Sequence, residues 1–184
     1  MKQILVALAC VLAIASQVEA NGEPAYRAEA QRLETFYALP PGLLEHICTV
    51  ESHWKPGAVG ELGEIGLCQL QPRFVAPLVK PGTLPAPSGE AVARFQTYAG
   101  IAVDGIIGPQ TREALTTRSN GKVVLALFDP YENLHWAARY LVSLRTLLKT
   151  NSPDILAAAY NGGPGSPAVR YMLKIRRVEG EREN

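Results

Sequence analysis

The sequence predicts a mainly α-helical protein whose helices are interrupted by one glycine-rich segment. Apolar residues recur at helical spacing in two regions, 24–56 and 120–176. Between them, residues 57–66 carry a glycine at every third position, which favours a tight irregular loop or a small β-hairpin. A Pro/Gly-rich linker and two short helical patterns over 80–119 indicate a small helical subdomain inserted into the larger one.

Residues 24–56 predict two helices separated by Pro40–Pro41. The second helix has an apolar face made of Leu43, Leu44, Ile47 and Val50. Glu51 follows this face directly, and Lys55–Pro56 must end the helix soon afterwards. We therefore expect the carboxylate of Glu51 to lie where a buried helix meets a loop.

The inserted segment predicts two short helices. Ser88 is the expected N-cap of the first, with Val92 and Phe95 pointing inward, and the second starts at Pro109.

The C-terminal region predicts three further helices. Asp129–Pro130 starts a long helix, with an apolar stripe of Leu134, Ala137, Ala138, Leu141, Leu144 and Leu148. Ser152 and Pro153 start the next, which ends near 161–163, and a last helix is expected over about 167–178.

The first twenty residues predict a secretory signal peptide. A lysine at position 2 precedes the apolar run "ILVALACVLAIA", and "VEA" ending at Ala20 has the small residues of a cleavage site. Lipidation of Cys10 is the alternative, but "ALAC" lacks the leucine expected three residues before the cysteine. No later apolar run is long enough to span a membrane. We therefore expect cleavage after Ala20 and export to the periplasm or cell envelope.

Composition and charge exclude some classes of function. The chain has 47 % hydrophobic and 19 % charged residues and a formal net charge of +1, which is ordinary for a globular protein. It has no basic stripe with interleaved aromatic residues, so nucleic acid is not an expected partner.

Cys48 and Cys68 remain after the predicted cleavage, in an oxidising compartment. A disulfide and two buried free thiols are both open. Zinc ligation by these cysteines with His46 and His53 is the third alternative, but their spacing matches no structural zinc pattern. We expect no metal ion and no cofactor.

Four motifs in order resemble those of soluble-type lytic transglycosylases, relatives of goose-type lysozyme. The first two are Glu51–Ser52 with Pro56 and Ala58, and Gly66–Leu67–Cys68–Gln69 with Pro72. The later two are "FDPYENLHWAARYL", with Asn133, and "AAYNGGPG". Cys68 replaces the family's methionine, and Glu64 stands where a small residue is usual. The resemblance implies a lysozyme-like α+β domain over 21–79 and 120–184, the signal peptide over 1–20, and the insert over 80–119.

The resemblance also implies a single catalytic carboxyl, Glu51. In that family the glutamate protonates the glycosidic oxygen between N-acetylmuramic acid and N-acetylglucosamine. It then takes a proton from the C6 hydroxyl, which attacks C1 and gives a 1,6-anhydro end. Ser52 and Gln69 would hold sugar substituents, Tyr160 would orient Glu51, and Asn161 would support the loop or the ligand. For Tyr160 a core position, and for Asn161 a helix C-cap, are the alternatives.

Two other functions stay open. A second carboxylate opposite Glu51, at Glu61 or Glu64, would permit hydrolysis, as in a lysozyme-type muramidase. A non-catalytic protein would bind peptidoglycan without releasing fragments.

The insert "VARFQTYAGIAVDGIIGPQTREAL" resembles the second half of a peptidoglycan-binding module. Retained binding and a purely structural insert are both open. Peptidoglycan glycan strands are the expected partner, and the resemblance adds an envelope-spanning secretion or conjugation machine.

Overall fold

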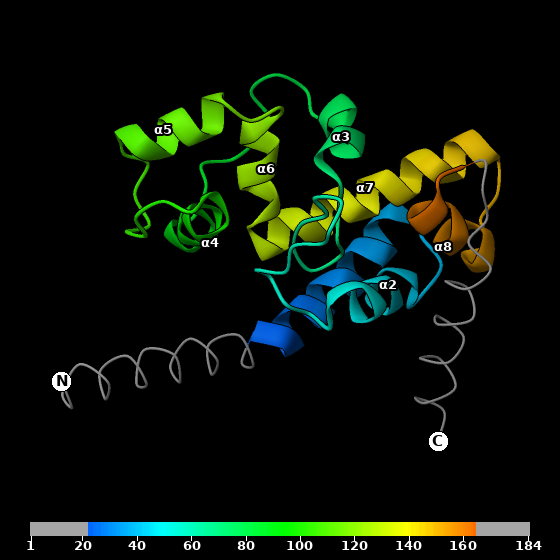
Figure 1. Cartoon of the computed structure of the whole chain (residues 1–184). Helices are drawn as coiled ribbons and strands as arrows, with labels where there is room; N and C mark the ends of the chain where they lie inside the picture. Colours follow the sequence, from blue (N-terminus) through cyan, green and yellow to red (C-terminus); the bar gives the residue numbers. More distant parts are fainter. Residues whose placement is uncertain (1–21, 165–184) are drawn as a thin grey trace.

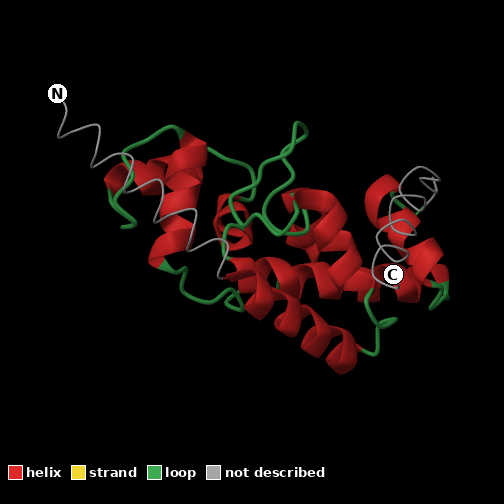
Figure 2. Ribbon diagram, turned by 90° about the horizontal axis from the view of Figure 1, so that it is seen from below, coloured by secondary structure: helices red, strands yellow, loops and turns green. Residues whose placement is uncertain are grey.

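The computed structural model describes residues 22–164. The predicted signal peptide, Cys10, the helix expected over 167–178 and the charged C-terminal tail lie outside these residues. The described chain is mainly helical, as predicted (Figures 1 and 2). After a helix over 22–37, the elements are α2 (Leu43–Ser52), α3 (Pro72–Val75), the 3₁₀ helix η1 (Ala76–Leu78), α4 (Gly89–Ala99), α5 (Pro109–Thr116), α6 (Gly121–Leu127), α7 (Pro130–Leu148) and α8 (Pro153–Gly162).

The long helix α7 forms the centre of the fold. It contacts α2, α3, α6 and α8 (Figure 1). Asp129 caps it by accepting hydrogen bonds from the N–H groups of Tyr131 and Glu132. The predicted apolar stripe from Leu134 to Leu144 is buried, and Leu148 is partly buried at its end.

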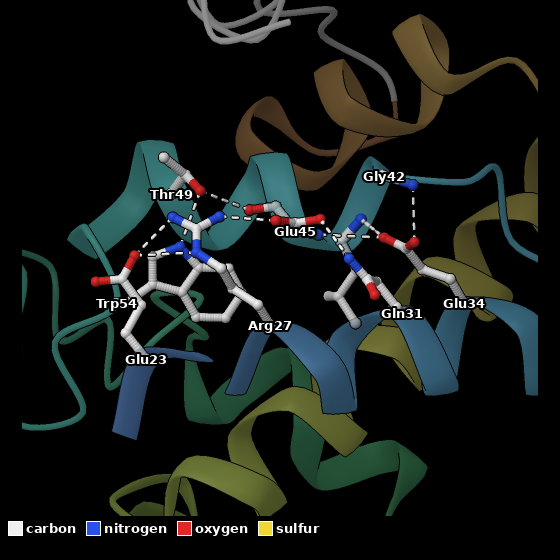
Figure 3. Close-up of polar contacts among 9 residues, drawn as sticks. Glu23, Arg27, Gln31, Glu34, Gly42, Glu45, Thr49 and Trp54 are labelled. Carbon is white, nitrogen blue, oxygen red and sulfur yellow. Dashed lines mark hydrogen bonds and ion pairs between the residues drawn. The ribbon is translucent and has the colours of Figure 1, made fainter. Parts of the chain in front are cut away.

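A buried carboxylate joins the first helix to α2 (Figure 3). Glu34 is 3 % exposed and accepts from the backbone N–H groups of Gly42 and Leu44, both at 2.7 Å, and from that of Glu45 at 3.2 Å. These are donors at the N-terminus of α2 that have no intrahelical partner. Glu34 therefore caps α2 from a neighbouring helix.

Arg27 adds a second link between the same two helices. Its guanidinium pairs with Glu23 and Glu45 at 2.7 Å each and lies 4.8 Å from the ring centroid of Trp54 (Figure 3). The indole N–H of Trp54 donates to the Thr49 hydroxyl at 2.9 Å. The turn after α2 is thus held against the first helix.

The inserted segment contacts the rest of the chain at α6 and, through Ser88 and Arg94, at the turn between α6 and α7. Both α4 and α5 contact α6, which in turn contacts α7 (Figure 1). As predicted, the Ser88 side chain caps α4, Val92 and Phe95 are buried, and α5 starts at Pro109. The proposed boundaries at 80 and 119 stay a prediction.

No helix within residues 22–164 is long and apolar enough to cross a membrane.

Candidate functional site

The glycine-rich segment between α2 and α3 is an irregular loop. In the described part of the chain it forms two isolated antiparallel bridges, Val59 with Ile65 and Ile65 with Leu70, and no strand. Gly63 and Gly66 have positive φ angles, 84° and 78°, which only glycine adopts at little cost. The loop alternative in our prediction is therefore nearer to the structure than a regular hairpin.

Asn133 of α7 is hydrogen-bonded to this loop. Its side chain is fully buried and donates to the carbonyls of Ile65 at 2.8 Å and Leu127 at 2.9 Å. It also accepts from the N–H of Cys68 at 2.9 Å. A Cβ at Gly66 would collide with the Asn133 amide and with the Leu127 carbonyl. The position of the Asn133 side chain therefore requires glycine at position 66, and Asn133 has a structural role.

Cys48 of α2 and Cys68 of the loop form a disulfide, with Cα atoms 4.2 Å apart. Both residues are fully buried. A disulfide leaves no thiolate for zinc, and residues 22–164 contain no group of three His, Cys, Asp or Glu side chains that could hold a metal ion.

A pocket of about 220 Å³ opens where α2, the loop, α3, α7 and α8 meet. It brings together four of the predicted site residues and the candidate second carboxylate. Its lining residues are Glu51, Glu64, Gln69, Leu70, Gln71, Phe74, Tyr140, Tyr160 and Asn161. Glu51 is half-buried at the C-terminal end of α2, as expected for a carboxylate where a helix meets a loop.

Ser52 is not one of the residues that line this pocket. It is 7 % exposed, its hydroxyl donates to the Leu67 carbonyl at 2.6 Å, and its oxygen accepts from the Lys55 N–H at 3.0 Å. The hydroxyl proton is thus already used within the protein. This geometry favours a role in holding the loop over contact with a sugar.

Tyr160 of α8 is hydrogen-bonded to the same loop. Its hydroxyl donates to the Cys68 carbonyl at 2.8 Å. Burial raises the pKa of Tyr160 well above its ordinary value of 10.0, and the negative charge of Glu51 raises it further. Tyr160 therefore stays protonated at any physiological pH, and its phenol lies within electrostatic reach of the Glu51 carboxylate.

The remaining predicted residues differ in how they face the pocket. The Gln69 side-chain amide donates to the carbonyls of Ala58 and Gly66, which fixes it on the loop. Glu64 accepts from the Gln71 amide at 2.6 Å and from the Leu62 N–H at 3.0 Å. Asn161 lines the pocket and is exposed; because Gly163 is the C-cap of α8, Asn161 is not the cap.

Sequence reasoning missed an aromatic wall. The ring of Phe74 stacks on that of Tyr140, with centroids 5.7 Å apart and planes 8° from parallel, and Tyr140 contacts Tyr160 at 5.5 Å. Phe74 is 39 % exposed although it lines the pocket. Its short helix carries no periodic pattern, so nothing local in the sequence pointed to it.

Two family models match the chain. Residues 29–92 match the transglycosylase SLT domain, and residues 82–115 match a putative peptidoglycan binding domain. The resemblance to lytic transglycosylases is confirmed. The two matches support a peptidoglycan lytic transglycosylase with a peptidoglycan-binding module, and peptidoglycan as its substrate. No curated protein matches the chain.

The first match covers Glu51, Glu64 and Gln69 but ends before Tyr140 and Tyr160. The side of the pocket formed by α7 and α8 therefore lies outside the matched residues. The second match lies within the predicted insert, 80–119.

Proposed function

We propose that the protein cleaves the β-1,4 bond between N-acetylmuramic acid and N-acetylglucosamine and leaves 1,6-anhydro-N-acetylmuramic acid ends. The observation that carries this proposal is one pocket lined by Glu51, by the buried Tyr160 and by Gln69 of the loop. The match to the transglycosylase domain supports the same class of reaction.

Glu51 acts first as the acid. It gives its proton to the glycosidic oxygen as the bond to C1 breaks, and the N-acetyl group of the substrate supports the electron-poor carbon. The resulting carboxylate then accepts the proton of the C6 hydroxyl as that oxygen attacks C1. Glu51 returns to its starting state, so one carboxyl serves both steps.

The other pocket residues would support this chemistry. Tyr160, which keeps its proton, holds the loop through the Cys68 carbonyl. The stacked rings of Phe74 and Tyr140 form the aromatic wall of the pocket and supply apolar surface against which a sugar ring can pack. Gln69 donates its amide hydrogens to the loop, so it would offer its side-chain oxygen to a sugar substituent, and Asn161 adds a second polar group.

Hydrolysis is the second candidate, because Glu64 lines the same pocket as Glu51. A muramidase needs a carboxylate that activates water on the far side of the sugar ring. The Glu64 side chain already accepts from Gln71 and Leu62, which favours a structural role for it over that of a base.

Digestion of purified sacculi tests both candidates. Anhydro products are one water lighter than muramidase products, so the masses of the released muropeptides separate the two reactions. Glu51→Gln should lower the release rate by at least about a hundredfold, since general acid–base catalysis contributes that much or more. The matched control is Glu61→Gln, an exposed glutamate of the same loop that does not line the pocket.

Three outcomes would contradict the proposal. Products with the added water, together with their loss in Glu64→Gln, would make the protein a muramidase. Full activity of Glu51→Gln would remove the assigned acid. Binding to sacculi without any release of fragments would identify a non-catalytic wall-binding protein.

We also propose that the protein acts in the periplasm or cell envelope, after loss of residues 1–20, and opens the wall for an envelope-spanning secretion or conjugation machine. Peptidoglycan lies outside the cytoplasm, so the substrate requires export. Detection of a mature N-terminus at Asn21 in a periplasmic fraction would test this localisation.

A further inference from the structure

Cys68 is the residue at which several contacts of the pocket converge. Its N–H donates to the Asn133 side chain at 2.9 Å, and its carbonyl accepts from the Tyr160 hydroxyl at 2.8 Å. The next residue, Gln69, lines the pocket. A displacement of Cys68 would therefore move both the partner of Tyr160 and the segment that carries Gln69.

The disulfide connects this point to the helix that carries Glu51. Cys48 lies on α2 three residues before Glu51, a little less than one helical turn. Its Cα atom is 4.2 Å from that of Cys68, and both residues are fully buried. The bond is thus a short covalent link between the last turns of α2 and the loop segment 68–69.

We propose that the Cys48–Cys68 disulfide is a positioning element of the active site, which fixes Glu51 relative to Tyr160 and Gln69. The inference rests on the proposed function. A catalytic carboxyl must be held closely in place, because a displacement of about 1 Å can cost a hundredfold in rate. The resembled family has methionine at position 68, which fills buried space but forms no such link.

A purely structural disulfide would have a different kinetic signature. It would raise the melting temperature of the protein, but once folded the enzyme would turn over at the same rate without it. A positioning disulfide changes kcat in the folded protein much more than KM. Its loss shifts Glu51 relative to the reacting bond and disturbs Gln69. Phe74, Tyr140 and Asn161, which also line the pocket, stay available to the sugar. The experiment therefore compares the change in kcat with the change in KM.

The test compares wild-type protein with the Cys48→Ala/Cys68→Ala variant on soluble peptidoglycan fragments. Both are assayed at a temperature where circular dichroism shows them folded. We expect kcat to fall by about ten- to a hundredfold and KM to change by less than about twofold. The control is Val92→Ala, a buried residue of α4 that does not line the pocket, which should lower the melting temperature and keep kcat.

A second variant keeps the test decisive if the double alanine variant does not fold. Cys48→Ala/Cys68→Met refills the buried volume without the covalent link, and we expect its melting temperature to recover while kcat stays low. In parallel, alkylation of denatured wild-type protein without reductant should leave the peptides that contain Cys48 and Cys68 unlabelled.

Wild-type kcat in either folded variant, or alkylation of both cysteines in active wild-type protein, would overturn the inference. Neither result would change the difference in muropeptide release between wild type and Glu51→Gln, on which the proposed function depends. Failure of the proposed function would instead appear as no release of muropeptides by the wild type, or as full activity of Glu51→Gln.

Discussion

A single hydroxyl group, that of Tyr160, holds the Cys68 carbonyl at the back of the pocket. Replacing Tyr160 with phenylalanine keeps the ring and leaves this buried carbonyl without its donor. An unsatisfied buried polar group costs about 1–3 kcal/mol, so we expect Tyr160→Phe to lower the free energy of unfolding by that amount in urea titrations. Turnover should also fall, because the loop that carries Gln69 loses a restraint.

Tyr131→Phe is the matched control for this substitution. Tyr131 is 49 % exposed at the start of α7 and does not line the pocket, so loss of its hydroxyl should change stability by less than about 0.5 kcal/mol. Equal stability of Tyr160→Phe and wild type would contradict the role assigned to the phenol.

The protonation state of Tyr160 adds a pH prediction to the same comparison. Its folded pKa is raised above 10.0, so whatever stability the protonated phenol contributes is fully present below pH 10.0 and is lost only as pH rises through the raised value. The activity profiles of wild type and Tyr160→Phe should therefore keep the same shape up to pH 10. An alkaline limb that disappears in the variant would identify Tyr160 as a titrating group.

Among the elements, α2 depends on a cap that a different helix supplies. Glu34 provides two carboxylate oxygens for three N–H donors at the start of α2. In Glu34→Gln one oxygen becomes an NH₂ group that faces an N–H donor, so we expect a loss of about 1–3 kcal/mol at neutral pH. Thermal or urea unfolding measures this loss, with the exposed Glu113→Gln on α5 as control.

The pH dependence of this loss has a definite sign. Burial, followed by the neighbouring Glu45, raises the pKa of Glu34 above 4.5, although the backbone donors oppose the shift. With a raised folded pKa, the contribution of Glu34 is greatest below pH 4.5 and declines as pH rises through the raised value. The difference in stability between wild type and Glu34→Gln should therefore narrow as pH rises from 4.5. A difference that widens would contradict this assignment.

The elements that could be predicted from the sequence are those with local end signals. Asp129–Pro130, Ser88 and Pro109 mark helix starts because a cap or a proline acts within one turn of the chain. The short helices α3 and η1 also have a proline at their start, but they carry neither a periodic pattern nor a side-chain cap, and a proline alone did not predict them.

The site could be predicted only in part for a related reason. Glu51, Gln69, Tyr160 and Asn161 were expected to meet because four ordered motifs resemble one family. Ser52 belongs to the same motif, yet its hydroxyl donates to the Leu67 carbonyl and it does not line the pocket. Side-chain direction at the end of a helix depends on the turn that follows, and spacing along the sequence does not report it.

In the insert, hydrogen bonds from Gln96 of α4 fix the loop between α4 and α5. This loop also exposes apolar side chains. The Gln96 side chain is 1 % exposed; its oxygen accepts from the N–H groups of Asp104 and Gly105, and its amide donates to Asp104 and Thr111. The motif residues of the binding module are therefore used to fix the loop. If the insert contacts the wall, other residues must make that contact.

Val103 and Ile106 are the exposed candidates on that loop, with 57 % and 65 % of their surface accessible. If the insert binds peptidoglycan there, the Val103→Ser/Ile106→Ser variant should sediment less with insoluble sacculi. Burying one such side chain at an interface contributes about 1.5–3 kcal/mol, so partial burial of two predicts at least a tenfold loss of affinity. The measurement uses the Glu51→Gln background, in which the wall should stay intact.

Leu147→Ser is the matched control, because Leu147 on α7 is also 65 % exposed but lies outside the insert. With Glu51 restored, the loop variant should digest soluble fragments at the wild-type rate, because neither residue lines the catalytic pocket. A loss confined to the insoluble wall would show that the insert concentrates the enzyme on its polymer, separately from the chemistry at Glu51. If the Glu51→Gln parent, the loop variant and the Leu147→Ser variant sediment equally, this loop does not bind the wall. The insert would then be a structural support that packs on the buried helix α6.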